Sequence, residues 1–118
     1  MEKKKILIVD DEFGFVEMLK IRFEANNYDV ITANDGEEAI HMLGERPDAI
    51  ILDVMMPNID GYTFLKEMKA NPETKDIPVI VVTAKPDMKD LFQMEGISNY
   101  VTKPIDSDEI LKILKSLL

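Results

Sequence analysis

Five short apolar runs alternate with segments of helical periodicity, and this alternation limits the fold of the 118-residue chain more than any other feature. The runs are ILIV, DVITA, AIIL, VIVV and YVT, at residues 6–9, 29–33, 49–52, 79–82 and 100–102. The first, third and fourth are continuously apolar, as in strands that are covered on both faces. Such strands need helices on both sides of the sheet, so a doubly wound parallel sheet is expected.

Apolar residues recur at spacings of three and four between these runs, which predicts amphipathic helices. The weakest pattern is that of the fourth segment, with Leu91 and Met94, and Ser107 is a candidate N-cap for the last helix. The helices are expected over residues 12–26, 36–45, 60–70, 87–95 and 107–117. The fold class is therefore α/β, with a single (βα)5 domain over residues 1–118.

The composition excludes several classes of function. The chain has no cysteine and a single histidine, His41, so thiolate sites and histidine-rich metal sites are unavailable. A net charge of −9 argues against direct binding of this domain to nucleic acid or to an anionic membrane, since both require clustered Lys and Arg. No apolar run approaches the roughly 20 residues of a membrane span, and the start MEKKK does not resemble a signal peptide. A cytoplasmic location is expected.

Acidic residues stand where two of the predicted strands end. Asp10 and Asp11 follow the first strand, and Asp53 follows the third. Doubly wound sheets place their ligand sites at the C-terminal ends of the strands, so these carboxylates converge if the two strands are neighbours. Three close carboxylates repel one another unless a cation lies among them. Oxygen ligands with retained waters suit Mg²⁺, which is the expected cofactor.

A hydroxyl and an ammonium group complete this edge of the predicted sheet, because Thr83 and Lys103 follow the fourth and fifth strands. A carboxylate can attack phosphorus, and phosphoryl transfer needs mainly positioning and neutralisation of the phosphoryl oxygens. Asp53 is therefore a candidate nucleophile. Each residue alone also has a structural interpretation, since strand-end aspartates often cap a helix. The combination favours the chemical interpretation.

Four stretches of the chain resemble the signatures of one family. ILIVDDE, ILDVMMPNIDG, VIVVTA and YVTKP are similar, in order, to motifs of the receiver domain of two-component response regulators, the CheY-like family. The resemblance spans nearly the whole chain. It implies a flavodoxin/CheY-like sheet of order 2-1-3-4-5 and transfer of a phosphoryl group to Asp53 from a phosphohistidine. The implied partner is a sensor histidine kinase or a histidine phosphotransfer protein. Such a receiver is a signalling switch that modifies itself, rather than an enzyme with a separate substrate.

The same resemblance implies the roles of the individual residues. Asp53 is the phosphoryl acceptor, and Thr83 and Lys103 bind the phosphoryl oxygens. The implied Mg²⁺ ligands are Asp10, Asp11, Asp53 and the backbone carbonyl of Met55. The resemblance thus implies a role for each of the polar residues at the C-terminal ends of the first, third, fourth and fifth predicted strands.

A conformational switch is implied as well. In similar receivers an aromatic residue three positions before the lysine turns inward when the threonine moves, and Tyr100 holds that position. The bond between Lys103 and Pro104 is implied to be cis. A downstream protein is expected to bind the face formed by the fourth helix, the fifth strand and the fifth helix.

The sequence departs from the family pattern in two places. The stretch from Thr83 to Tyr100 is shorter than is usual, and Ile97 replaces a small residue, so a short or displaced fourth helix is expected. Met55 and Lys85 stand beside the implied path of a hydrolytic water. Because a thioether orients water poorly, a long-lived phosphorylated form is expected.

Other functions compete with this interpretation. A flavodoxin-like cofactor module needs a phosphate-binding loop after the first strand, where this chain has DDEF. Phosphatases with an aspartate nucleophile usually carry a second aspartate two residues later, where this chain has Met55. The third alternative is a pseudo-receiver, an interaction module that takes no phosphate. The set of acidic, hydroxyl and ammonium groups described above weighs against it.

Overall fold

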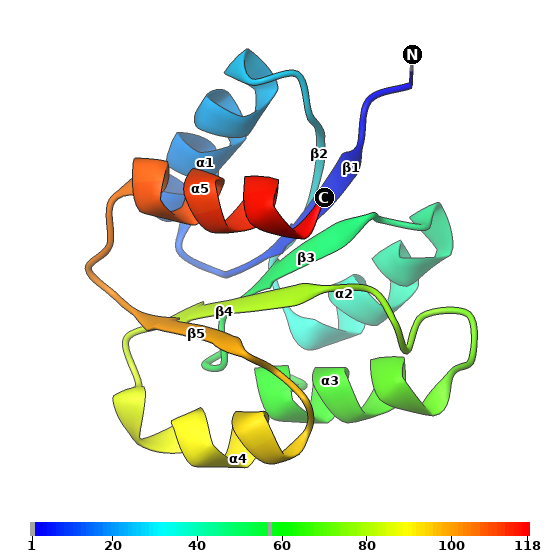
Figure 1. The fold of residues 1–118 in the computed structure, drawn as a ribbon. Coiled ribbons are helices and arrows are strands. Elements are labelled where there is room, and N and C mark those ends of the chain that lie inside the picture. Colours follow the sequence, from blue (N-terminus) through cyan, green and yellow to red (C-terminus); the bar gives the residue numbers. More distant parts are fainter. Residues whose placement is uncertain (1, 57) are drawn as a thin grey trace.

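The computed structural model describes residues 2–56 and 58–118 and contains a five-stranded parallel sheet with helices on both faces (Figure 1). The order β2-β1-β3-β4-β5 confirms the predicted doubly wound α/β fold. The strands are β1 Lys5–Val9, β2 Asp29–Ala33, β3 Ala49–Leu52, β4 Val79–Thr83 and β5 Asn99–Thr102. The helices are α1 Phe13–Ala25, α2 Gly36–Met42, α3 Gly61–Ala70, α4 Lys89–Met94 and α5 Ser107–Leu117, with 3-10 turns η1 Leu43–Glu45 and η2 Pro86–Met88.

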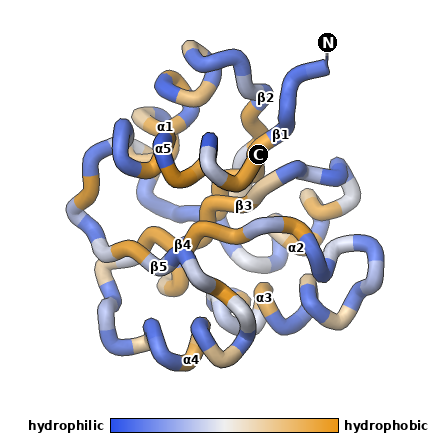
Figure 2. Tube along the Cα trace, in the orientation of Figure 1, coloured by the Kyte–Doolittle hydropathy of each residue, from blue (hydrophilic) through white to orange (hydrophobic). Residues whose placement is uncertain are grey.

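Two hydrophobic cores lie on opposite faces of the sheet. Helices α1 and α5 cover one face, and α2, α3 and α4 cover the other (Figure 1). Alternate residues of each central strand serve the two cores: Ile6 and Ile8 pack towards α1 and α5, whereas Leu7 and Val9 pack towards the other helices. The apolar colour therefore runs without interruption along the central strands (Figure 2). Burial of each such side chain contributes about 1.5–3 kcal/mol, which explains the continuous apolar runs.

The strand register brings distant residues together at one edge of the sheet. Val9 pairs with Leu52, and Asp53 donates its backbone N–H to the Val9 carbonyl at 2.9 Å. Thr83 pairs with Thr102, and the Lys103 N–H donates to the Thr83 carbonyl at 2.7 Å. The residues that follow these strands therefore emerge side by side.

Some helix ends differ from the sequence prediction. Ser107 is not the N-cap of α5, because Asp106 is extended and its carboxylate accepts from the Asp108 N–H at 3.0 Å. Aspartate and serine are about equally effective N-cap residues. Ser107 is instead the first residue of the helix and is buried. Helix α4 is short, as expected, with six residues after a 3-10 turn that begins at Pro86. No helix within the described ranges is long and apolar enough to cross a membrane.

The loop after β3 packs tightly against the start of α3. Gly61 donates its N–H to the Val54 carbonyl at 2.9 Å, and a Cβ at Gly61 would lie 2.5 Å from the Asp53 carbonyl oxygen. Because the proline ring fixes φ, the sequence predicts that Pro57 stiffens this loop, but Pro57 lies outside the described residues. Because Gly61 has no side chain, the start of α3 can approach the backbone of Asp53 this closely.

Substitution Gly61→Ala should destabilise the fold by about 1–3 kcal/mol, because backbone atoms must move to admit the methyl group. Urea denaturation followed by circular dichroism measures this change. Gly14→Ala is the matched control, since a Cβ at Gly14 in α1 meets nothing within 4 Å. The control should be neutral or stabilising by about 0.5–1 kcal/mol. Equal stabilities of the two variants would contradict the packing argument.

Candidate functional site

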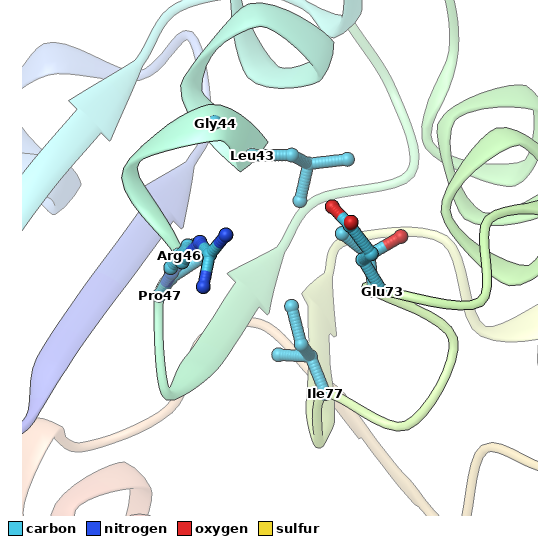
Figure 3. Close-up of a pocket in the computed structure, with 7 residues that line it drawn as sticks. Leu43, Gly44, Arg46, Pro47, Glu73 and Ile77 are labelled. Atoms are coloured by element: carbon cyan, nitrogen blue, oxygen red, sulfur yellow. The ribbon is translucent and has the colours of Figure 1, made fainter.

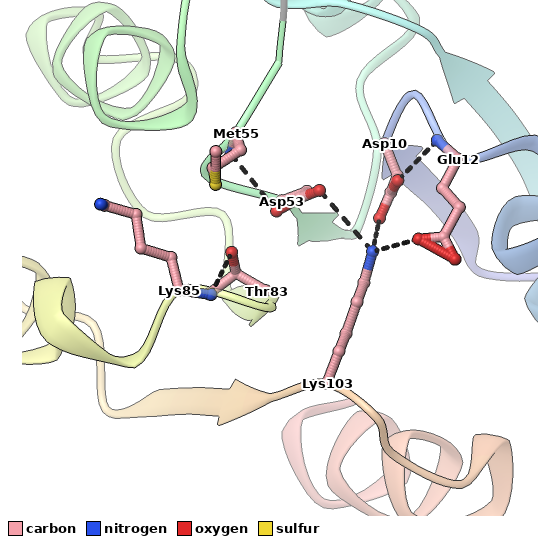
Figure 4. Close-up of polar contacts among 7 residues, drawn as sticks. All are labelled: Asp10, Glu12, Asp53, Met55, Thr83, Lys85 and Lys103. Atoms are coloured by element: carbon pink, nitrogen blue, oxygen red, sulfur yellow. Dashed lines mark hydrogen bonds and ion pairs between the residues drawn. The ribbon is translucent and has the colours of Figure 1, made fainter.

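Three carboxylates converge where β1 and β3 end. One oxygen from each of Asp10, Asp11 and Asp53 lies within 4.8 Å of the others. Asp10 and Asp53 are buried, with exposed fractions of 2% and 7%, while Asp11 is exposed. Hydrogen bonds fix the two buried carboxylates, because the Glu12 N–H donates to Asp10 Oδ1 at 2.8 Å and the Met55 N–H donates to Asp53 Oδ1 at 3.3 Å (Figure 4).

The ammonium group of Lys103 enters this cluster from the end of β5. Its Nζ lies 2.8 Å from Asp10 Oδ2, 3.3 Å from Glu12 Oε2 and 3.6 Å from Asp53 Oδ2 (Figure 4). The Lys103–Pro104 peptide bond is cis, the isomer that the resemblance implied. Lys103 therefore places a positive charge beside both buried carboxylates.

Burial and charge shift the pKa values of this pair. Burial raises the pKa of Asp10 above its ordinary 3.8, and the hydrogen bond from Lys103 offsets this only in part. Burial would lower the pKa of Lys103, but the hydrogen bond to Asp10 and the charges of Asp10 and Asp53 outweigh it, so the pKa of Lys103 lies above its ordinary 10.5. The lysine is charged at neutral pH. Because the carboxylates outnumber the ammonium group, a further negative charge at the site is unfavourable unless a cation accompanies it.

Thr83 and Tyr100 are joined through the backbone of one residue. Thr83 is fully buried, and its Oγ1 accepts from the Lys85 N–H at 3.3 Å. The Tyr100 hydroxyl donates to the Lys85 carbonyl, and its ring is 7% exposed. The Tyr100 ring also packs on Phe92 of α4, with 5.6 Å between ring centroids. Tyr100 thus points inward and ties β5 to the loop after β4.

A cavity of about 430 Å³ opens beside the acidic cluster. Its wall contains Val54, Met55, Met56 and Met88, with Asp11, Asp60 and Lys85 as the polar members. Met55 is 58% exposed, so its thioether faces solvent next to Asp53. The cavity has room for a group of the size of a phosphoryl group, and apolar side chains, four of the seven that line it, stand beside two carboxylates and an ammonium group.

A separate pocket of about 410 Å³ lies at the other end of the sheet, between the segments that precede β3 and β4 (Figure 3). Arg46 and Glu73 face each other across it, between Leu43 and Ile77 (Figure 3). This pocket shares no residue with the acidic cluster. It therefore takes no part in the chemistry considered below.

The donor set at the acidic cluster fits Mg²⁺. Hard divalent cations prefer oxygen ligands, and Mg²⁺ retains several waters beside a few carboxylates. A fixed cluster of three carboxylates supplies that set and gains from the neutralisation of its repulsion. The backbone carbonyl of Met55 as a further ligand stays a prediction.

A family comparison decides the class of protein. The profile described as "Response regulator receiver domain" matches residues 6–115. The chain belongs to the response regulator receiver family. Receiver domains typically bind Mg²⁺ at an acidic cluster such as that of Asp10, Asp11 and Asp53.

Curated relatives agree with this assignment. The receiver is 41% identical over 121 residues to a "Probable transcriptional regulator ycf27" of Cyanophora paradoxa, covering 100% of this chain and 49% of the relative. It is 41% identical over 118 residues to the "Alkaline phosphatase synthesis transcriptional regulatory protein PhoP" of Bacillus subtilis, covering 98% of this chain and 48% of the relative. The receiver thus spans about half the length of these relatives.

Solved structures resemble the receiver over almost its full length. Chemotaxis response regulator CheY4 of Vibrio cholerae is 31% identical, with a TM-score of 0.90 and coverage of 98% of this chain and 99% of that one. Response regulator TrrA of Thermotoga maritima, solved in complex with Mg²⁺ and BeF, is 34% identical, with a TM-score of 0.86 and coverage of 98% and 99%. The CheY-like fold is therefore shown by both sequence and structure.

The structure brings the predicted site residues together and adds two. Asp10, Asp11, Asp53 and Lys103 form one cluster, as the strand ends predicted. Sequence reasoning missed Glu12, whose carboxylate pairs with Lys103, and Phe15, whose ring centroid lies 4.2 Å from Lys103 Nζ. The run of acids in DDE could have suggested Glu12. No sequence signal pointed to Phe15, because the apolar pattern of a helix does not depend on which residues its buried side chains contact.

Substitution Lys103→Met should destabilise the metal-free receiver by about 3 kcal/mol at neutral pH, since two buried carboxylates lose their cation. The pKa of Asp10 is raised, so Asp10 takes up a proton as the pH falls from neutral towards that pKa, and its negative charge disappears. The difference in free energy of unfolding between Lys103→Met and wild type should therefore decrease as the pH falls. Addition of Mg²⁺ should also decrease this difference. Urea titrations at several pH values measure the effect.

The control for this prediction is Lys66→Met, which removes the exposed ion pair between Lys66 and Glu95. Exposed pairs contribute little to stability. This variant should therefore stay close to wild type, and Mg²⁺ should stabilise it as much as it stabilises wild type. A Lys103→Met protein as stable as the control variant at neutral pH would show that the carboxylates do not depend on the lysine.

Proposed function

We propose that Asp53 accepts a phosphoryl group from a phosphohistidine and that the receiver acts as a phosphorylation-dependent signalling switch. One observation carries the proposal: three carboxylates and the Lys103 ammonium meet at one point, with Thr83 at the end of the neighbouring strand. A carboxylate beside bound cations is a competent nucleophile. A site built only for stability would not gather three acids around one lysine, because their repulsion opposes folding.

The transfer forms one bond and breaks another. An oxygen of Asp53 attacks phosphorus, and the bond between phosphorus and the imidazole nitrogen of the donor breaks. The imidazole leaves with the electron pair and takes a proton from water. Mg²⁺, when bound to Asp10, Asp11, Asp53 and the Met55 carbonyl, neutralises charge on the phosphoryl oxygens. Lys103 and Thr83 donate to the remaining oxygens.

Phosphorylation is proposed to act on the link between Thr83 and Tyr100. The Thr83 hydroxyl accepts from the Lys85 N–H and keeps its own proton to donate to a phosphoryl oxygen. Movement of Thr83 pulls on the Lys85 backbone, whose carbonyl accepts from Tyr100. Tyr100 already points inward in this structure, so the modification is proposed to stabilise this conformer relative to an outward one rather than to create a new fold.

The partners follow from this role. The phosphodonor is a sensor histidine kinase or a histidine phosphotransfer protein. A downstream protein reads the face formed by α4, β5 and α5, where Tyr100 and α4 are in contact. A cytoplasmic location and a lack of direct contact of this domain with nucleic acid or membrane are part of the same proposal, in keeping with the net charge of −9.

Incubation with Mg²⁺ and acetyl phosphate should add one phosphoryl unit to the wild-type protein, as measured by intact mass. Asp53→Asn should take up none, because the amide is a poor nucleophile. Asp76→Asn, an exposed aspartate away from the site, is the matched control and should react like wild type. Removal of Mg²⁺ with a chelator should abolish the uptake. A wild-type protein that takes up nothing would support the pseudo-receiver alternative instead.

The phosphorylated form should persist for minutes or longer after the donor is removed. The thioether of Met55 accepts hydrogen bonds weakly, so it orients an attacking water poorly. Met55→Asn should shorten the lifetime several-fold, since an amide can hold the water in line. Mass spectra taken during the decay give both rates. Loss of the wild-type phosphoryl group within seconds would contradict the prediction.

A further inference from the structure

Lys103 has a third acidic partner that the proposed chemistry does not use. Its Nζ lies 3.3 Å from Glu12 Oε2, closer than the 3.6 Å to Asp53 Oδ2. The two hydrogen bonds of the ammonium go to Asp10 and Glu12, both at the end of β1. The hydrogen bonds of the lysine therefore lie on the β1 side, while Asp53 is held only by the longer ion pair.

An aromatic ring supports the same position of the ammonium. The Phe15 ring, on the first turn of α1, has its centroid 4.2 Å from Lys103 Nζ, within the range of a cation–π contact. Phe15 is 9% exposed, so the core of the α1 face holds the ring. Glu12, by contrast, has a 63% exposed side chain. One partner of the lysine is packed in the core, and the other is mostly exposed to solvent.

We propose that Glu12 is a positioning residue that, with Phe15, holds the Lys103 ammonium on the β1 side of the site and so slows transfer of a phosphoryl group to Asp53. The inference rests on the proposed function, because it concerns the speed of that reaction. Lys103 already lies 3.6 Å from Asp53 Oδ2, but its two hydrogen bonds go to Asp10 and Glu12, so pairing with an incoming phosphoryl group requires it to exchange one of these partners. Glu12 competes with the phosphoryl oxygens for the same ammonium.

The size of the effect follows from the exposure of Glu12. An exposed ion pair is weak, and its full loss corresponds to roughly a two- to fivefold change in an equilibrium or rate. Glu12→Gln keeps the length of the side chain and removes its charge. The rate of phosphoryl uptake from acetyl phosphate should rise roughly two- to fivefold in this variant. Glu12→Asp, which keeps the charge, should stay nearer to wild type.

A matched control separates this effect from a change in net charge. Glu24→Gln removes the same charge from an exposed position near the C-terminal end of α1, whose N-cap is Glu12. Its uptake rate should equal that of wild type. If Glu24→Gln accelerates uptake as much as Glu12→Gln does, the positioning role is overturned.

A double-mutant cycle tests whether Glu12 acts through the lysine. If it does, Glu12→Gln should have no effect on uptake when Lys103 is already replaced by methionine. If Glu12 merely repels the anionic donor, the same acceleration should persist in that background. Persistence of the effect overturns the inference.

A spectroscopic readout separates this inference from the proposed function. In ¹⁵N-lysine-labelled protein without any phosphodonor, the side-chain ammonium signal of Lys103 should shift in Glu12→Gln and stay in place in Glu24→Gln. An unmoved Lys103 signal in a protein that does accept phosphate overturns the positioning role alone. Failure of the wild-type protein to take up phosphate, in contrast, overturns the proposed function and with it the effect on rate.

Discussion

The burial of two carboxylates beside a single lysine is the constraint on which the rest of the site depends. Asp10 and Asp53 lie at the ends of adjacent strands and are almost inaccessible to water. Charges in such a position are unfavourable unless they are paired. Lys103 supplies the pairing from the end of β5, on the far side of β4. Lys103 and the two buried carboxylates thus form one charge network, and loss of any member leaves a buried charge without its partner.

The fold explains why the two buried carboxylates stay close together despite their repulsion. Two hydrophobic cores hold the strands in register, so the carboxylates cannot separate without loss of apolar packing on both faces of the sheet. A chain of contacts also connects this end of the sheet to α4. Thr83 is hydrogen-bonded to the backbone N–H of Lys85 and Tyr100 to its backbone carbonyl. The Tyr100 ring packs on Phe92 of α4. Tyr62 of α3 also packs on Phe92, with 5.6 Å between ring centroids.

Most of the architecture could be predicted from the sequence, because its determinants are local or periodic. Continuous apolar runs identify strands covered on both faces, and acids directly after such runs locate the edge that carries the chemistry. Residues whose role depends on packing between distant elements could not be predicted this way. Phe15 contacts Lys103 across 88 positions of sequence, a contact that no periodicity encodes. The N-cap at Asp106 instead of Ser107 shows a second limit, since adjacent residues with similar capping strength cannot be ranked without the backbone angles.

The most direct test of this account is a crystal structure of the protein with Mn²⁺, as an anomalous-scattering substitute for Mg²⁺, and with beryllium fluoride as a phosphoryl analogue. The account predicts one metal bound by Asp10, Asp11 and Asp53, with the analogue on Asp53 in contact with Thr83 and Lys103. Metal density elsewhere, or an analogue that leaves Asp53 free while the three carboxylates point apart, would contradict it.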